Sequence, residues 1–506
     1  MGKETGCTVL WQSLEKRSHA ASALARHQFN SLERWLYSEE VTHMGLRGVE
    51  LGEEKRGRQL LRLLLQAHIE GRGNGDVGPA IEVSDRSHPD EATLFTHKRM
   101  HVRSIVTLFG EVSVRRLGYG MPGKASIHPL DEQLQLPARI YSYEIQRRLV
   151  KKAVQGPFDE AVDALFEATG VKMPKRTAEE IVIDASRDFD RFYACRQGNG
   201  GHEGGPILVG SVDCKGIPMV KSELSPKKIR RGKGEKAQKK KMATVAAVFT
   251  QKPRIRTPEE VVESLFSPEK GREKKRDKDC RPERKRIWAS LEAGKDSFIS
   301  DVKEEMNRRD PRGGKLRVVL TDGEKALQHR VMRAMKGGVL VLDLVHVLEK
   351  LWSAGHALYG EGSDDAEKFV RDRALRLLKG KVSQVVKGLR QIVTKRKLKG
   401  NKKKKLSGAA NYFYRNRTRM CYDQYLAKGL PIATGAVEGA CKNLIKDRME
   451  RSGMRWSQKM AEAMVKMRAV YLSGDFDEYW DYHINQDQAR LYPKECWRPA
   501  VPVVAK

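Results

Sequence analysis

The hydrophobic positions of this chain change their period along its length, which predicts helical regions on either side of a sheet. Residues 18–69 have apolar positions at helical spacing and end at the glycine-rich break 71–78. Residues 104–119 alternate between apolar and polar positions around Phe109, as the two strands of a β-hairpin do. The first part of the chain is therefore predicted to be mainly helical, with one hairpin.

Three further helices are predicted after the hairpin. Residues 142–154 and 158–169 form the first two, and Thr177 with Glu180 has the spacing of a capping box that opens the third. Gly170 marks the turn before that third helix. A helix, a glycine turn and a second helix with basic residues nearby are typical of a helix-turn-helix that reads DNA, although a plain helical bundle would have the same pattern.

The middle of the chain changes to a strand pattern. Strands are predicted at 207–213, 216–221, 242–249, 316–321 and 338–342, with helices at 324–335 and from 343 to 352. Gly216 and Pro218 indicate a tight turn between the first two strands. Three consecutive strands, then strand, helix, strand and helix, is the order of a ribonuclease H-like core, which is an α/β fold with a mixed sheet.

Two charged insertions interrupt this pattern, and helices follow it. The first insertion, 221–241, is strongly basic and can grip phosphates or remain a solvated loop. The second, 257–314, contains a predicted helix at 286–307. Later helices are predicted at 364–393, 408–428 and 457–472, and the acidic and aromatic segment 476–482 is expected to pack back onto the core. In the helix 408–428, aromatic residues beside arginines can stack on bases, or simply cover a half-buried face.

Composition narrows the class of partner. The chain has 506 residues, of which 39% are hydrophobic, so it can bury a real core. Its 97 Lys and Arg residues outnumber 65 Asp and Glu residues, which gives a net charge of +32 and favours a polyanionic partner, with nucleic acid first, over a merely basic surface. Seven scattered cysteines without a CxxC pair indicate a reducing compartment and no zinc module. We find no signal peptide or membrane-spanning run, so we expect a soluble cytoplasmic protein.

Three acidic residues stand where strands or helices could bring them together. Asp213 ends the first core strand, Asp322 follows a later strand, and Glu438 lies in the first turn of a helix. Cleavage of a phosphodiester by two metal ions about 4 Å apart needs carboxylates from separate elements. Each acid also has an ordinary explanation: Asp213 and Asp322 suit turns, and Glu438 suits the positive end of a helix. The three acids occur in the order in which a ribonuclease H-like core would bring them together, and this order favours a shared metal site.

A family resemblance adds to this interpretation. The segments VDCKGIPM, LTDGEKAL, LDLVHVLEKLW and IATGAVEGACKNLIKDRME, followed by SGMRW, resemble the motifs of DDE-type transposases of bacterial insertion sequences, specifically the ISKra group, with a looser similarity to Mutator-like enzymes. The resemblance covers residues 104–472. It implies a ribonuclease H-like catalytic core with the triad Asp213, Asp322 and Glu438, and Asp343 with His346 matches the D-x-x-H element of such families. Cys214 stands where the family usually has glycine.

The resemblance implies an enzyme, a DNA transposase that binds terminal inverted repeats and catalyses strand cleavage and transfer with two Mg²⁺ or Mn²⁺ ions. We expect Asp213, Asp322 and Glu438 to bind metal, and His346 to join them in catalysis. The expected partners are double-stranded element ends and target DNA, with a homo-oligomer on DNA, no membrane and a nucleoid-associated location. A catalytically inactive DNA-binding derivative and a nuclease or resolvase of the same fold remain alternatives. The residues expected to contact DNA are Lys227, Lys228, Arg230, Arg231, Lys442, Arg448 and Arg455.

These patterns divide the chain into five predicted regions. They are an N-terminal helical region (1–90), a hairpin and helix-turn-helix-like DNA-binding region (91–200), the first part of the core (201–352), an all-helical insertion (353–430), and the completion of the core with the glutamate helix and the tail (431–506).

Overall fold

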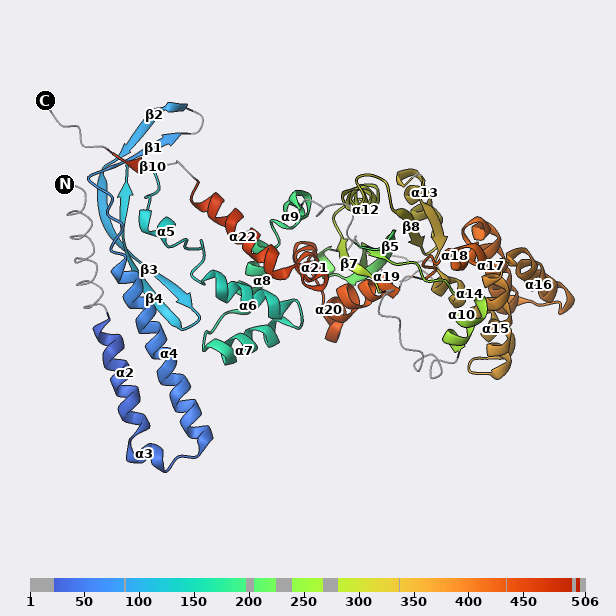
Figure 1. Cartoon of the computed structure of the whole chain (residues 1–506), viewed down its shortest axis with the longest axis horizontal. Coiled ribbons are helices and arrows are strands. Elements are labelled where there is room, and N and C mark those ends of the chain that lie inside the picture. Colours follow the sequence, from blue (N-terminus) through green and yellow to red (C-terminus); the bar gives the residue numbers. More distant parts are fainter. Residues whose placement is uncertain are drawn as a thin grey trace. The chain divides into compact units, whose positions relative to one another are not determined.

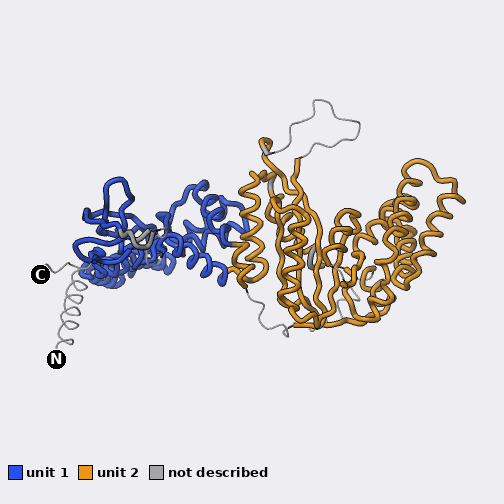
Figure 2. Tube along the Cα trace, turned by 90° about the horizontal axis from the view of Figure 1, so that it is seen from above, with its two compact units in different colours: residues 1–188, 477–506 blue, residues 189–476 orange. Residues whose placement is uncertain are grey.

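The computed structural model forms two compact units, which are coloured separately in Figure 2. One unit contains Met1–Asp188 and Asp477–Lys506, and the other contains Phe189–Phe476. The residues that the structure describes are 22–85, 88–196, 204–223, 239–266, 281–335, 337–433, 435–493 and 497–500. No helix within these ranges is both long and apolar enough to cross a membrane.

The first unit begins with a pair of packed helices, which together occupy most of the region 18–69 that the sequence predicts to be helical. Helix α2 (Ala23–Leu36) and helix α4 (Leu46–Gly71) lie side by side and are joined through the short helix α3, Glu39–Thr42 (Figure 1). Trp35 of α2 packs against Gly52 of α4, where a Cβ atom would lie only 2.2 Å from the indole ring. Glycine at this position therefore lets the two helices approach closely.

Two small sheets follow in the same unit. Strands β3 (His97–Thr107) and β4 (Gly110–Gly120) form the predicted hairpin. The second sheet has the order β10-β1-β2, and the sequence pattern did not predict it. Its strands are β1 (Ile81–Asp85), β2 (His88–Phe95) and β10 (Trp497–Pro499). Because β10 comes from the other end of the chain, only the folded structure brings it to β1.

The three predicted helices of the first unit form with one correction. They are α6 (Tyr143–Ala153), α7 (Phe158–Thr169) and α8 (Lys175–Ala185), preceded by the short α5 (Pro129–Gln133). Gly170 has φ 70°, the left-handed conformation that ends α7. The predicted capping box is wrong, because α8 starts at Lys175 with Pro174 as its N-cap and without a side-chain cap. Glu180 instead pairs with Arg139 at 3.2 Å.

The acidic and aromatic tail packs on these helices, so the prediction that it returns to the core is wrong. It forms helix α22 (Phe476–Leu491), nearly all of which belongs to the first unit. The hydroxyl of Tyr143 donates to Asp487 at 2.7 Å, and the imidazole of His483 lies 2.7 Å from the carboxylate of Asp188. Polar pairs between segments this far apart in sequence leave no periodic signal.

The second unit is built around a mixed sheet. Five of its described strands have the order β7-β6-β5-β8-β9. Strands β7, β6 and β5 pair antiparallel, whereas β5, β8 and β9 pair parallel. The strands are β5 (Ile207–Pro218), β6 (Lys240–Gln251), β7 (Glu283–Ser290), β8 (Leu316–Thr321) and β9 (Val339–Leu342). The mixed α/β class that the sequence predicts is confirmed.

Two strand predictions in this sheet need correction. Strand β5 runs without a turn through Gly216, which pairs with Met242 of β6. A Cβ at Gly216 would meet the Lys240 side chain at 3.0 Å, so glycine leaves room for that side chain. Strand β7 replaces the start of a predicted helix, since its buried Ile287 and Trp288 pair with β6, and the helix α12 begins only at Lys295.

Helices cover the sheet and extend beyond β9. Near the strands lie α9 (Phe189–Cys195), α12 (Lys295–Arg309), α13 (Lys325–Ala334) and α21 (Gln458–Ser473). The helical part contains α10 (Pro258–Phe266), α14 (Leu344–Tyr359), α15 (Asp364–Leu378), α16 (Val382–Lys395), α17 (Gly400–Asn416) and α18 (Tyr422–Ala427). The long helix predicted at 364–393 is divided between α15 and α16, because Gly380 takes φ 74°. The helix predicted at 408–428 is likewise divided.

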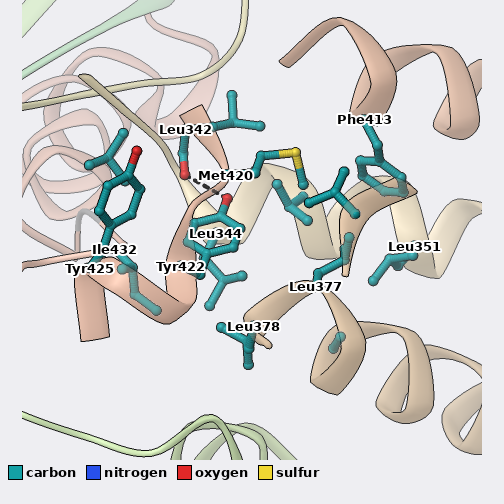
Figure 3. Close-up of a cluster of buried hydrophobic side chains, with 14 of the residues drawn as sticks. Leu342, Leu344, Leu351, Leu377, Leu378, Phe413, Met420, Tyr422, Tyr425 and Ile432 are labelled. Carbon is teal, nitrogen blue, oxygen red and sulfur yellow. Dashed lines mark hydrogen bonds between the residues drawn. The ribbon is translucent and has the colours of Figure 1, made fainter. Parts of the chain in front are cut away.

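The helical part is joined to the sheet by one continuous core. Leu342 at the end of β9 packs in the same cluster as residues of α14, α15, α17 and α18 (Figure 3). The hydroxyl of Tyr422, which is fully buried, donates to the backbone carbonyl of Leu342 at 2.7 Å. This core fixes α14 and α17 against the end of the sheet where the acidic residues lie.

Candidate active site

Three aspartates line one edge of the parallel part of the sheet. Val212 of β5 pairs with Thr321 of β8, and Thr321 pairs with Leu342 of β9. Each of these residues is followed by an aspartate: Asp213, Asp322 and Asp343. Because neighbouring strands lie about 4.8 Å apart, the aligned register brings the three backbones to the same edge. The sequence predicts two of these residues as ligands, and the register adds the third as their neighbour.

Asp213 is held by groups on both sides of its carboxylate. Its Oδ1 accepts a hydrogen bond from the backbone N–H of Cys214 at 2.6 Å, and its Oδ2 accepts one from the thiol of Cys441 at 3.2 Å. Cys441 begins a π-helical turn, Cys441–Lys446. Such turns are rare and frequent at functional sites. Sequence reasoning missed Cys441, although its position three residues after Glu438 was a usable signal.

Asp322 lies in a tight turn that another helix supports. Its Oδ1 accepts from the backbone N–H of Glu324 at 2.8 Å, and its carbonyl accepts from the hydroxyl of Tyr412, on α17, at 2.7 Å. Gly323 takes φ 86°, and a Cβ there would lie 2.6 Å from the Tyr412 hydroxyl. Burial, together with the charge of Asp213, raises the pKa of Asp322. No pattern in the sequence connects Tyr412 with this turn.

Glu438 is the most perturbed of the three predicted ligands. It lies in α19 (Gly435–Ala440). Burial, and next the charge of Asp343, raises its pKa to about 7, against the opposing effect of His346. Its Oε1 is buried and has no hydrogen-bond partner among the described residues. A buried carboxylate oxygen without a donor is costly, and a bound cation would satisfy it.

His346 and Asp343 have different roles at the start of α14. Asp343 is buried, and its Oδ1 accepts from the backbone N–H of Val345 at 2.8 Å, which makes it the N-cap of the helix. His346 lies 3.3 Å from the carboxylate of Glu349. Burial alone would lower the pKa of His346, but the hydrogen bond to Glu349 and the charges of Asp343 and Asp213 outweigh it and raise the pKa. The imidazolium form is therefore more stable here than in a histidine free in solvent.

The structure brings the four predicted catalytic residues into one electrostatic neighbourhood. Asp213 and His346 each act on the pKa of Asp322 and also on the pKa of Glu438. Glu349 joins this neighbourhood through His346. Sequence reasoning missed Glu349, although its i, i+3 spacing from His346 on one helix was visible.

The side chains at this site are of the kind that binds a divalent cation, but in this structure they are not arranged as a complete metal site. Carboxylate oxygens are the ligands that Mg²⁺ and Mn²⁺ prefer, and the orphaned Oε1 of Glu438 fits the need for such an ion. Within the described ranges, no group of three or more His, Cys, Asp or Glu side chains is arranged so that it could hold a metal ion. The residues thus fit the ion in kind, and closure around it would require side chains to move.

The predicted DNA contacts fall into three groups. Lys442 and Arg455 are exposed and available to a phosphate. Arg448 is fully buried, lies over the ring of Trp456 with its Cζ atom 4.9 Å from the ring centroid, and so has a packing role in place of the predicted contact. The remaining four, Lys227, Lys228, Arg230 and Arg231, lie outside the described residues.

No protein-family model matches this chain, and no curated protein sequence matches it.

Proposed function

We propose that this protein is a DDE-type transposase of the bacterial insertion-sequence class, with a ribonuclease H-like core. The strand order β7-β6-β5-β8-β9, with β6 antiparallel and β8 and β9 parallel to the central β5, supports that fold. The similarity of the sequence motifs to the ISKra group supports the family.

One observation carries the proposal. Asp213 and Asp322 follow paired positions on parallel strands, and Glu438, from a helix far along the chain, shares two electrostatic neighbours with Asp322. Carboxylates gathered from separate elements are what hydrolysis and transesterification of a phosphodiester by two cations require. The buried Oε1 of Glu438, which has no hydrogen-bond partner among the described residues, adds support, because a cation would satisfy it.

Each residue then has a distinct task. Asp213 and Asp322 would hold the cations, and Glu438 would complete the set. Bound there, two Mg²⁺ or Mn²⁺ ions would activate the attacking oxygen and stabilise the leaving oxygen. The pKa of Glu438 is raised to about 7 without metal, so a cation that binds there would displace its proton and make metal binding depend on pH near neutrality. His346, whose pKa is raised, would present a positive charge to the scissile phosphate.

DNA is the proposed partner, as the charge of the chain suggests. The net charge of +32 favours binding of a polyanion by release of counterions. The helices α6, α7 and α8 would recognise the element ends, although Lys175 pairs with Asp159 at 2.7 Å and would have to exchange that partner for a phosphate. We expect binding to weaken steeply as salt rises, and a flat salt response would contradict this part of the proposal.

A strand-transfer assay tests the function. Purified protein is incubated with Mg²⁺, a target plasmid and labelled DNA that carries the ends of the encoding element. We expect joined products from the wild type and none from Asp322→Ala, while the exposed acid variant Asp365→Ala joins DNA normally. Cleavage without joining would indicate a nuclease or resolvase, and binding without cleavage an inactive derivative. Joining by Asp322→Ala at the wild-type rate would exclude the proposed site.

A further inference from the structure

A basic groove lies between α16 and α17, in the helical part of the second unit. Its volume is about 480 Å³, within the range of ligand-binding clefts. Lys387, Arg390 and Lys395 of α16 line it on one side, and Tyr414 of α17 lines it on the other. Val386 contributes an apolar surface between them. The groove therefore combines cations with an aromatic ring.

The two helices that line this groove carry charge of one sign. Neither helix carries an acidic residue, and the chain has no Asp or Glu between Asp372 and Asp423. Lys387, Arg390 and Lys395 are all exposed. Basic side chains on helices without acidic residues repel one another, and a bound polyanion would neutralise them.

Tyr414 is an exposed aromatic residue with two guanidinium groups over its ring. Its exposed fraction is 47%. The Cζ atom of Arg417 lies 4.5 Å from the centre of its ring, and that of Arg390 lies 5.3 Å away. An unpaired base would take the place of one guanidinium group on the ring or stack on the outer face of that group, while nearby lysines hold the phosphates.

Helix α17 connects the groove to the candidate active site. Tyr412 reaches Asp322 from one side of α17, and Tyr414, two residues later, faces the groove. Because successive residues are rotated by about 100° around a helix, these two side chains point in roughly opposite directions. A strand in the groove would thus lie about one helix diameter, roughly 10 Å, from the candidate active site. The groove is a separate subsite and does not hold the reacting phosphodiester.

We propose that the groove between α16 and α17 binds a single-stranded segment of DNA next to the reacting site, with a base stacked on Tyr414 and phosphates held by Lys387, Arg390 and Lys395. That the occupant is DNA rests on the proposed function. An unpaired strand fits better than a duplex, because the bases of a duplex are stacked on each other and cannot use the exposed ring. A duplex would use the cations alone.

Binding of two probes to the full chain tests this proposal. The probes are a labelled single-stranded oligonucleotide of mixed sequence and the same strand annealed to its complement, measured by fluorescence anisotropy without divalent metal. We expect Tyr414→Ala to weaken single-strand binding by at least about fivefold and to leave duplex binding almost unchanged. Tyr414→Phe keeps the ring and should bind as the wild type does. Tyr37→Ala, which removes a tyrosine that is 86% exposed in the other unit, is the matched control.

The lysine and arginine of α16 have their own test. The double variant Lys387→Ala/Arg390→Ala should lower the slope of log Kd against log salt for the single strand by about 1.4, because each lost phosphate contact contributes about 0.7. Lys368→Ala/Arg376→Ala removes an exposed lysine and arginine from α15 and should leave the slope unchanged. Thermal unfolding confirms that each variant is folded.

Three results would refute the proposal that the groove binds single-stranded DNA. They are equal binding by Tyr414→Ala and Tyr37→Ala, equal weakening of single strand and duplex by Tyr414→Ala, and equal salt slopes for the α15 and α16 double variants. The strand-transfer assay separates this outcome from failure of the proposed function. If the wild type joins DNA but the groove variants bind single strands normally, only the subsite is refuted. If the wild type does not join DNA but single-strand binding depends on Tyr414, only the transposase function is refuted.

Discussion

The hydroxyl of Tyr412 donates a hydrogen bond to the backbone carbonyl of Asp322 at 2.7 Å, across 90 residues of sequence. Tyr412 belongs to the helical part, and Asp322 begins the turn after β8. Helix α17 therefore does more than enlarge the core, because it determines where the backbone of a proposed metal ligand lies.

Tyr412→Phe should lower the rate of strand cleavage by about tenfold to a hundredfold, since loss of one anchor allows Asp322 to shift. It should also cost about 1 kcal/mol of unfolding free energy, the usual worth of a hydrogen bond. Tyr492→Phe is the matched control, because Tyr492 donates to the backbone carbonyl of Leu136 at 3.0 Å within the first unit, which does not contain the site. Urea unfolding and cleavage rates measure both effects. Equal cleavage by the two variants would show that Tyr412 only stabilises the fold.

Gly323→Ala should be more damaging than Gly337→Ala, although the two glycines have nearly equal φ angles of 86° and 87°. Each substitution places alanine in the left-handed region, at a cost of about 1–2 kcal/mol. At Gly323 the new Cβ would also meet the Tyr412 hydroxyl, whereas at Gly337 no atom of the described residues lies within 4 Å. Unfolding free energies of the two variants measure the difference. Equal destabilisation would mean that the contact between α17 and the turn is loose.

Glu438→Gln should respond to metal in a way that reveals the site. Without metal, the variant should be at least as stable as the wild type, because the substitution removes a buried charge near Asp343 and Asp213. With Mn²⁺ at about a hundred times its Kd, the wild type should gain about 2.7 kcal/mol and the variant much less. Thermal unfolding in each condition measures the gain. An equal gain in both proteins would place the ion elsewhere.

His128 should make the first unit sensitive to acid. The Nε2 atom of His128 lies 2.8 Å from Nδ1 of His101. Burial, followed by the charges of Arg116, His101 and Arg103, lowers the pKa of His128 to about 4. Between pH 6.5 and 4, His128 is mostly protonated in the unfolded chain and mostly neutral in the folded chain. The folded state therefore loses stability as pH falls through this window.

His128→Gln cannot take up that proton and should remove part of the loss. The part should be on the order of 1 kcal/mol, since the ring is only half-buried and solvent screens its charge. Urea midpoints at the two ends of the window measure it. Parallel curves for the wild type and the variant would assign the acid sensitivity to other groups.

The three proposed ligands can be named from the sequence, but most of the groups that hold them in place cannot. Asp213, Asp322 and Glu438 could be named because each stands beside an apolar run or a glycine that marks the end of an element. Tyr412 could not be named as a partner of Asp322, because a hydrogen bond between distant segments leaves no periodic trace, and only the spacing of Cys441 from Glu438 pointed to Cys441.

The sequence by itself determined the mixed α/β class, most of the core strands and helices, and a strongly basic character, since these follow from local periodicity and summed charge. Only the tertiary structure decided that β5 runs on through Gly216, that Arg448 is buried, and that α22 packs with the first unit. The physical reason is that strand pairing, burial and ion pairs are set by neighbours in space. A local sequence pattern indicates whether a residue packs against apolar or polar groups, but it does not specify which residue of the chain supplies them.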